Sequence, residues 1–297
     1  MKISTLTILS ILLFSCSSEP TQETVNTEIE DDTLAMVEDD STIAQIEEEV
    51  DIDTTVYEAL TFGYANETGD TLLQMNKEDG PQPEEFKYAI NKEGTISKIA
   101  YIGKQESGQF DTHRDNHYNF NNAEGQLYEM TEGVADEWNT TLFLTEDFRS
   151  KRELLTTVKN SWFSLKENET NEIEQNKKRT IKKSELVNDY GEKGKLIFAE
   201  FEQENDSCLV SLIWMDNQKF TYFDFPAEYN EMSTWRVDDG GVFDFEYYNI
   251  IAVFESENGI EIMTDWVGAE GSSINYLLAV GDKFESVGGA YRYQAPM

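Results

Sequence analysis

The residues most able to do chemistry lie in one short polar segment, residues 111–117 (DTHRDNH), which holds both histidines of the chain. If this segment is a strand, Asp111, His113, Asp115 and His117 point to the same face, and if it is a helix the two histidines lie one turn apart. Imidazole and carboxylate groups at such spacing are ligands for a divalent transition metal such as zinc. The competing interpretation is an exposed edge or loop, because the segment is polar and directly precedes a predicted hairpin.

A second set of candidate residues lies between Phe223 and Tyr248, where carboxylates alternate with aromatic side chains. The residues considered for ligand binding are Tyr229, Trp235, Asp238 and Asp239. Aromatic faces beside carboxylates suit sugar binding, and a carboxylate pair is the minimum for glycoside hydrolysis. The same composition is expected of strands that face a core on one side and water on the other, so a structural role is the alternative.

No catalytic motif accompanies either set of residues. The sequence lacks Gly-x-Ser-x-Gly, a phosphate-binding loop, a dinucleotide fingerprint and paired-cysteine metal motifs. We therefore expect a non-enzymatic binding or envelope-associated protein, with no cofactor apart from the divalent metal considered above. The alternative is an enzyme, or a metal- or glycan-binding protein, held at the same location.

The amino terminus has the features of an export signal. Lys2 is followed by an apolar stretch, residues 3–14, which is too short to span a bilayer comfortably. The stretch ends in Leu13-Phe14-Ser15-Cys16, which resembles the lipobox of bacterial lipoproteins. The resemblance implies cleavage before Cys16 and a lipid on its thiol, hence an extracytoplasmic protein anchored to a membrane. Serine rather than aspartate after the cysteine indicates the outer membrane.

The charge of the chain is strongly negative and unevenly distributed. The formal net charge is −36, and residues 3–76 contain no lysine or arginine. Such a charge excludes nucleic acid as a partner, since nucleic-acid binding requires basic side chains. Residues 16–54 are acidic and poor in apolar side chains, so we expect a lipidated cysteine followed by a disordered tether. The remaining partner is an unknown protein or glycan.

One type of turn recurs in the folded part. An Asn or Ser followed three residues later by Gly is typical of a hairpin turn, and it occurs at 66–69, 91–94, 122–125 and 256–259. Two of the predicted hairpins, at 88–96 and 118–127, resemble the tyrosine-aspartate (YD) repeats of secreted shell proteins. This resemblance implies hairpins and no particular function.

The predicted fold is mainly β, with antiparallel hairpins or a meander in one large domain or two subdomains, and a propeller-like arrangement as one form of it. Leucine, valine and tryptophan residues at helical spacing predict one amphipathic helix near 146–166, with Thr145 as its N-cap. Cys208 lies in a strand-like run, which predicts a small core residue. The expected regions are a signal peptide (1–15), the lipidated cysteine and tether (16–54), an N-terminal β-hairpin region (55–145), a helix and basic polar connector (146–190) and an aromatic-rich C-terminal β region (191–297).

Overall fold

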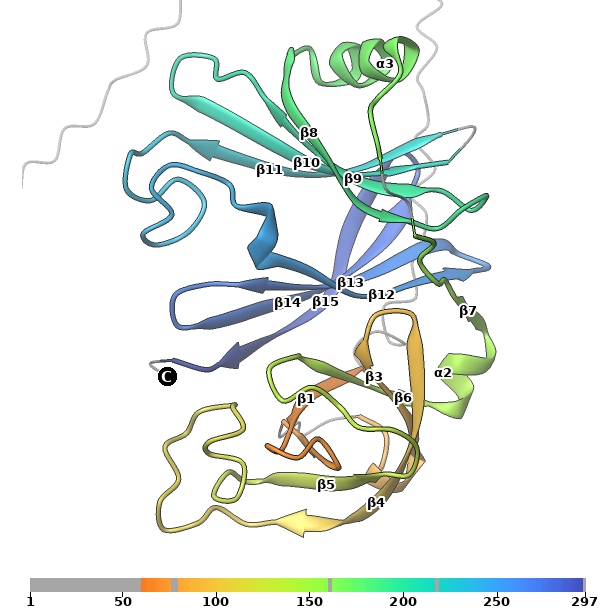
Figure 1. Cartoon of the computed structure of the whole chain (residues 1–297), viewed down its shortest axis with the longest axis vertical. Coiled ribbons are helices and arrows are strands. Elements are labelled where there is room, and N and C mark those ends of the chain that lie inside the picture. Colours follow the sequence, from red (N-terminus) through yellow and green to blue (C-terminus); the bar gives the residue numbers. More distant parts are fainter. Residues whose placement is uncertain (1–59, 76–79, 160–161, 217–218, 296–297) are drawn as a thin grey trace, which may run out of the picture. The chain divides into compact units, whose positions relative to one another are not determined.

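The first part of the described chain forms a closed antiparallel barrel. The computed structural model describes residues 60–75, 80–159, 162–216 and 219–295, so Cys16 and the predicted tether lie outside the described residues. The strand order around the barrel is β1-β2-β5-β4-β3-β6 (Figure 1). A short 3-10 helix, η1 (Pro83–Glu85), precedes the third strand. The barrel strands are β1 (Thr61–Ala65), β2 (Thr71–Gln74), β3 (Phe86–Lys92), β4 (Thr95–Gln105), β5 (Gly125–Met130) and β6 (Thr141–Thr145).

The interior of the barrel is filled by apolar and aromatic side chains. Phe86, Tyr128 and Phe143 form its centre, with ring centroids between 5.0 and 6.4 Å apart. Strands β1 and β2 approach so closely at Gly63 that a Cβ there would lie 2.0 Å from the carbonyl oxygen of Leu73. Glycine at this position is therefore a steric requirement of closing the barrel.

The remaining strands form a nine-stranded sheet in the order β7-β12-β13-β14-β15-β11-β10-β9-β8. It consists of two antiparallel meanders, β8 to β11 and β12 to β15, with β7 added at one edge. A single parallel pairing, Tyr222 opposite Lys283, joins the meanders. The strands are β7 (Arg152–Leu154), β8 (Ile181–Asp189), β9 (Lys195–Phe201), β10 (Ser207–Met215), β11 (Phe220–Glu228), β12 (Tyr248–Ser256), β13 (Gly259–Val267), β14 (Gly271–Val280) and β15 (Lys283–Tyr293), with the 3-10 helix η2 (Phe245–Tyr247) before β12.

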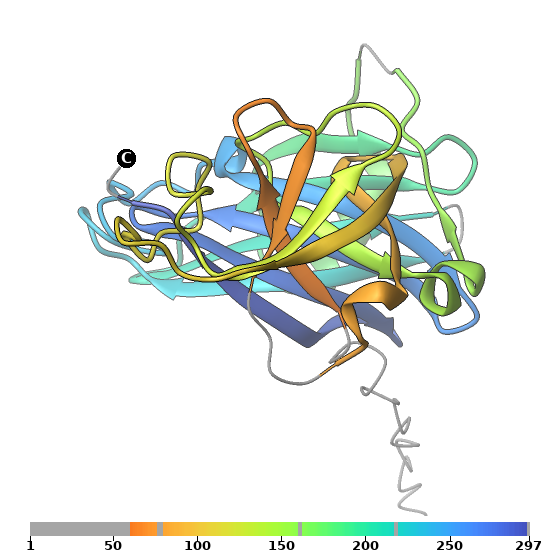
Figure 2. The same ribbon diagram turned by 90° about the horizontal axis from the view of Figure 1, so that it is seen from below.

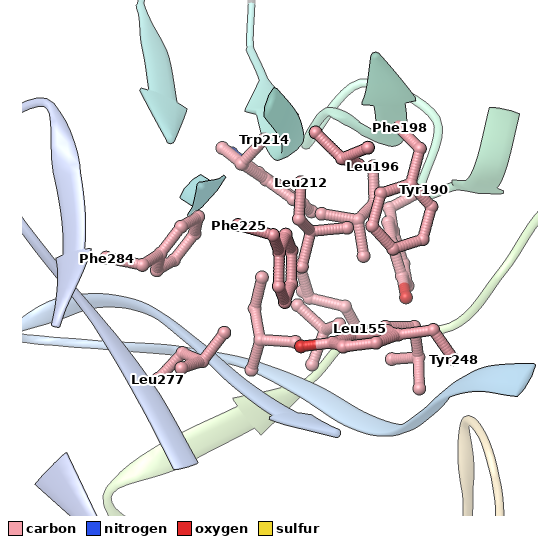
Figure 3. Close-up of a cluster of buried hydrophobic side chains, with 14 of the residues drawn as sticks. Leu155, Tyr190, Leu196, Phe198, Leu212, Trp214, Phe225, Tyr248, Leu277 and Phe284 are labelled. Atoms are coloured by element: carbon pink, nitrogen blue, oxygen red, sulfur yellow. The ribbon is translucent and has the colours of Figure 1, made fainter. Parts of the chain in front are cut away.

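The sheet curls around its own core, so that both meanders contribute to one apolar cluster. Figure 3 shows Leu212 and Phe225 from the first meander facing Tyr248 and Leu277 from the second. On the outer side of the first meander, Ile173 of helix α3 (Glu167–Lys177) packs against a separate cluster on β9, β10 and β11. The first meander is thus covered on both faces.

The barrel packs against the other face of the second meander. Phe62 of β1 and Leu142 of β6 share a buried cluster with Phe254, Met263 and Tyr276 of β12, β13 and β14. Figure 2 shows the barrel strands from this side, crossing in front of the blue strands of the sheet. Strands β12 to β14 are therefore buried on both faces, which explains why their sequences are nearly continuous apolar runs.

The predicted helix over 146–166 is much shorter in the structure. Helix α2 covers only Glu146–Ser150, and Thr145 caps it by accepting a hydrogen bond from the backbone N–H of Phe148, as predicted. The chain then becomes strand β7, which pairs with β12. Leu154 packs on the barrel side of the sheet and Leu155 in the core on the other side. Adjacent residues with opposite orientations require extended backbone, so pairing with β12 overrides the helical spacing.

Three of the four predicted hairpin turns are confirmed, because residues 66–69, 91–94 and 256–259 connect β1 to β2, β3 to β4 and β12 to β13. The fourth is wrong: residues 122–125 end the long loop between β4 and β5, and so 118–127 is not a hairpin. The prediction of a mainly β fold with antiparallel meanders is confirmed. The strands form a barrel and a curled sheet and not a propeller.

Cys208 is buried in β10, where burial raises the pKa of its thiol. Neither helix of the described chain combines the length and the apolar character that crossing a membrane requires.

Candidate functional site

A polar cavity of about 360 Å³ lies between loops of the barrel and one end of the sheet. Segments far apart in the sequence form its wall: the β3–β4 turn, the β4–β5 and β5–β6 loops, and strands β12, β13 and β15. We call this space the Arg292 cavity. Its most informative lining residues are Glu93, His117, Trp138, Thr140, Asp265 and Arg292.

Arg292 of β15 is almost completely buried, with 1% of its surface exposed. Its Nε donates to the backbone oxygen of Asp115 at 2.8 Å, and its Nη1 donates to the backbone oxygen of Trp138 at 3.1 Å. The guanidinium carbon lies 5.2 Å from the ring centroid of Tyr64. Arg292 thereby ties the two barrel loops that line the cavity to the last strand of the sheet.

Asp265 of β13 is also buried, with 6% of its surface exposed, and Thr140 connects it to Arg292. The hydroxyl of Thr140 donates to Asp265 Oδ2 and accepts from Arg292 Nη1 at 3.2 Å. Burial lowers the pKa of Arg292 to about 10, and the charge of Asp265 opposes this shift only in part. At neutral pH the arginine is therefore charged.

Two polar atoms on the cavity wall have no hydrogen-bond partner. Among the described side chains, the buried atoms without a partner are Asp265 Oδ1, His117 Nδ1 and the hydroxyl of Tyr64, and the first two belong to residues that line the cavity. An unpaired buried polar atom costs about 1–3 kcal/mol. Such atoms beside a cavity indicate a place where a ligand or ordered water completes the hydrogen bonding.

Aromatic rings form one side of the cavity. The ring of His117 lies 3.9 Å from that of Tyr118 and 4.5 Å from that of Trp138, measured between centroids. Trp138 lines the cavity and is 49% exposed, which leaves part of its indole free to contact a ligand. The cavity thus combines buried polar groups with an accessible aromatic ring, as small-molecule sites commonly do.

Glu93, at the β3–β4 turn, lines the cavity and links the barrel to the sheet. Its carboxylate accepts hydrogen bonds from the hydroxyl of Tyr190 and from Asn188 Nδ2, the latter at 2.8 Å. Burial raises the pKa of Glu93, and these hydrogen bonds only partly offset the rise. The partners of Glu93 are neutral hydrogen-bond donors, and burial outweighs them, so its environment favours the neutral carboxyl more than usual.

The structure places three residues of the predicted metal set, Asp111, His113 and Asp115, at one surface pocket and His117 at the Arg292 cavity. They lie in the β4–β5 loop, where His113 has φ of 57°, a left-handed conformation that fits neither a strand nor a helix. Asp111 Oδ2 and His113 Nδ1 are 3.4 Å apart. His117 turns away toward Trp138. In the described part of the chain, no three His, Cys, Asp or Glu side chains are grouped as metal ligands.

Asp115, the fourth member of the metal set, holds the loop to the sheet. Its carboxylate accepts from the backbone N–H of Tyr293 at 3.1 Å, and its own N–H donates to the backbone oxygen of Tyr293 at 2.6 Å. Burial raises the pKa of Asp115, against the effect of the hydrogen bond from Tyr293. These two hydrogen bonds hold the loop against β15, and His117, two residues further along the loop, lies at the cavity.

The predicted ligand-binding set occupies the loop between β11 and β12, and two of its members already have internal partners. Asp239 accepts hydrogen bonds from four backbone N–H groups, which outweigh burial and keep its pKa below the usual range. Trp235 donates its indole N–H to the backbone oxygen of Phe225 at 3.1 Å. Tyr229 and Asp238 are exposed. None of the four lines the Arg292 cavity.

His117 was predicted as a metal ligand, whereas Asp265 and Arg292 were not predicted as site residues. One signal for Asp265 is present, because it is a carboxylate inside the apolar run of β13 and lies on the same face of that strand as Met263, a core residue. No comparable signal marks Arg292, because most residues of its strand are exposed or partly exposed and form no apolar run. Comparisons with protein-family models, with curated proteins and with solved structures give no match for this chain.

Proposed function

We propose that this chain is a lipid-anchored extracytoplasmic protein of a bacterial envelope, and that its β domain binds a small polar ligand in the Arg292 cavity without transforming it. The observation that carries the binding role is Asp265: a carboxylate 6% exposed, with one unpaired oxygen, on the wall of a cavity of about 360 Å³. Volumes of roughly 300–1,000 Å³ are typical of small-molecule sites.

The proposed location rests on the sequence of the amino terminus. The short apolar leader ends in a lipobox-like Leu13-Phe14-Ser15-Cys16, and the acidic segment after it suits a spacer between an outer membrane and the β domain. Several acyl chains on one cysteine make a durable anchor, because each buried methylene contributes about 0.8 kcal/mol.

Labelled palmitate tests the anchor in a bacterial host that processes lipoproteins. We expect the wild-type chain to take up label and to fractionate with membranes, and Cys16→Ala to do neither. Cys208→Ala is the matched control, since it removes the other cysteine of the chain, and it should stay labelled. Label that survives Cys16→Ala would overturn the anchor.

The binding role is tested on the purified full chain with a panel of small polar compounds: putrescine, agmatine, glucosamine, glucose, glutamate and citrate. At least one should raise the melting temperature of the wild type, because a ligand that binds only the folded state stabilises it. Asn249→Trp fills the cavity from an exposed position on β12, and it should abolish the shift.

Glu285→Trp is the control for that variant, since Glu285 is exposed on β15 and does not line the cavity. It should keep the wild-type response. A panel that leaves the wild type unshifted, or a shift that persists in Asn249→Trp, would count against the cavity as a binding site.

A further inference from the structure

Several hydrogen-bond donors on the wall of the Arg292 cavity already bind the protein itself. Asn116 Nδ2 donates to the backbone oxygen of Gln294 at 2.9 Å, and the hydroxyl of Thr140 donates to Asp265. Arg292 directs Nε and Nη1 at backbone oxygens and at Thr140. These particular donors are therefore engaged and less available to a ligand.

Two buried atoms of the described residues on the cavity wall lack a partner, Asp265 Oδ1 and His117 Nδ1, and the first of them is an acceptor. Asp265 Oδ1 has no partner, and a carboxylate oxygen can only accept while it is ionised. A ligand that completes this site must bring an N–H or O–H donor to Asp265. The remaining question is which type of donor the wall accommodates.

We propose that the Arg292 cavity selects small organic cations that carry a primary ammonium or a guanidinium group. A hydroxyl group brings one donor but also two acceptor lone pairs, to which the engaged donors of Asn116 and Thr140 have nothing to offer. An ammonium or guanidinium group brings donors only, and it pairs with Asp265 Oδ1 through a charge-assisted hydrogen bond. This inference rests on the proposed binding function and names its ligand class.

The overall charge of the chain supports a cation. On the cavity wall itself the carboxyl groups of Glu137 and Asp265 match the basic side chains of Lys92 and Arg292 in number, and burial raises the pKa of the third carboxyl group, that of Glu93. The chain as a whole carries a net charge of −36, which attracts cations and raises their local concentration.

The partly exposed indole of Trp138 adds a second attraction for a cation. Trp138 lines the cavity and is 49% exposed. A cation is attracted electrostatically to the face of a tryptophan ring. A ligand head group held between Asp265 and Trp138 would use both features.

Matched pairs of compounds test the inference on the purified full chain by calorimetry. Putrescine is compared with butanediol, and glucosamine with glucose, so that each pair differs in ammonium against hydroxyl. We expect the ammonium member of at least one pair to bind about 10- to 100-fold more tightly, the range of a hydrogen bond between charged groups. Added salt should weaken this preference.

Asp265→Asn should remove most of the preference, because it keeps the shape of the side chain and removes its charge. Glu285→Gln makes the same change of charge at an exposed position outside the cavity, and it should bind as the wild type does. Glu137→Gln, at the partly exposed edge of the cavity, should weaken ammonium binding to a lesser degree. It serves as the second variant if Asp265→Asn does not fold.

The outcomes separate this inference from the proposed function. If hydroxyl compounds bind as tightly as their ammonium partners, or if Asp265→Asn weakens both members equally, the cation preference is wrong and the binding site stands. If both Asp265→Asn and Glu137→Gln leave ammonium binding unchanged, the cation inference is also wrong. Absence of binding by every compound in both panels contradicts the proposed function itself.

Discussion

Strand β13 carries two buried carboxylates on one face, Glu261 and Asp265, and each lies near a buried arginine, but the two sites are built differently. Glu261 forms a direct ion pair with Arg152, with 2.6 Å between Oε2 and Nε. Asp265 reaches Arg292 only through the hydroxyl of Thr140. The first site is closed by direct contact, whereas the second leaves a carboxylate oxygen open beside a cavity.

The partners of Glu261 complete its hydrogen bonding. The hydroxyl of Ser256 donates to Oε1 at 2.6 Å, and the hydroxyl of Tyr276 donates to Oε2. The guanidinium of Arg152 also lies over the ring of Phe148, 3.8 Å from its centroid. Both oxygens of this carboxylate are occupied by neighbouring elements of the fold, so the site has no vacancy for a ligand.

The pKa values of the two arginines shift in opposite directions. Burial disfavours the charged form of Arg152, but the hydrogen bond and charge of Glu261 outweigh burial and raise its pKa. Burial dominates at Arg292 and lowers its pKa to about 10. Arg152 and Glu261 thus satisfy each other, whereas Asp265 keeps one oxygen without a partner, as the proposed binding site requires.

The largest expected effect on stability comes from changing Glu261, the ion-pair partner of Arg152. Glu261→Ala should lower the free energy of unfolding by about 3–5 kcal/mol, because it leaves Arg152 charged and buried without its partner. Urea denaturation of the purified protein measures this loss. The double variant Arg152→Met with Glu261→Leu should recover most of the stability, since replacing both charges by apolar groups removes the desolvation cost. A loss below about 1 kcal/mol for Glu261→Ala would contradict the assignment of this pair to stability.

The sequence predicts the strands that are buried on at least one face and misses those that are not. Within the predicted aromatic-rich β region (191–297), strands β9 to β15 form. β8 lies in the segment predicted as a helix and polar connector (146–190), because it is a polar edge strand. It forms because the neighbouring strand β9 supplies backbone hydrogen bonds, which the sequence of β8 itself does not indicate.

The residues of the Arg292 cavity are harder to predict from sequence, because they come from several separate segments. Its wall combines loops between barrel strands with strands of the sheet, and only the packing of barrel on sheet brings them together. The metal hypothesis assumed a regular element at 111–117, but the left-handed His113 breaks any period. His117 therefore reaches the cavity, while Asp111 and His113 remain on another part of the surface. Such an arrangement has no signature in local spacing.

The second-largest expected effect on stability concerns Thr140, whose hydroxyl connects Arg292 to Asp265. Thr140→Val keeps the size of the side chain and removes the hydroxyl, so Asp265 loses its hydrogen bond at Oδ2 and Arg292 loses an acceptor. We expect the free energy of unfolding to fall by about 1–3 kcal/mol, the cost of leaving a buried polar group unpaired. Thr140→Ser, which keeps the hydroxyl, is the control and should retain most of this stability. An equal loss in both variants would mean that the bridge has no special contribution.

A smaller effect is expected for Asp265→Asn in the absence of ligand. The amide oxygen can still accept from Thr140, and the substitution removes a buried charge that lacks one partner. The free energy of unfolding should therefore change by no more than about 1 kcal/mol, far less than for Glu261→Ala. This contrast is the most direct test of the comparison. If Asp265→Asn destabilises the chain as strongly as Glu261→Ala, both carboxylates are structural.

The smallest expected effect on stability is a pH dependence at Glu93, a buried carboxyl group whose hydrogen-bond donors, Tyr190 and Asn188, are neutral. Burial raises its pKa in the folded state, so the folded chain binds more protons than the unfolded chain between the unfolded and folded pKa values. Stability from Glu93 should therefore increase as pH falls from neutral toward the ordinary glutamate range. Urea denaturation of the wild type and Glu93→Gln at neutral and mildly acidic pH isolates this contribution, because the other carboxylates are common to both. The wild type should gain on the variant as pH falls, and a gain in the opposite direction would show that the hydrogen bonds from Tyr190 and Asn188 dominate over burial.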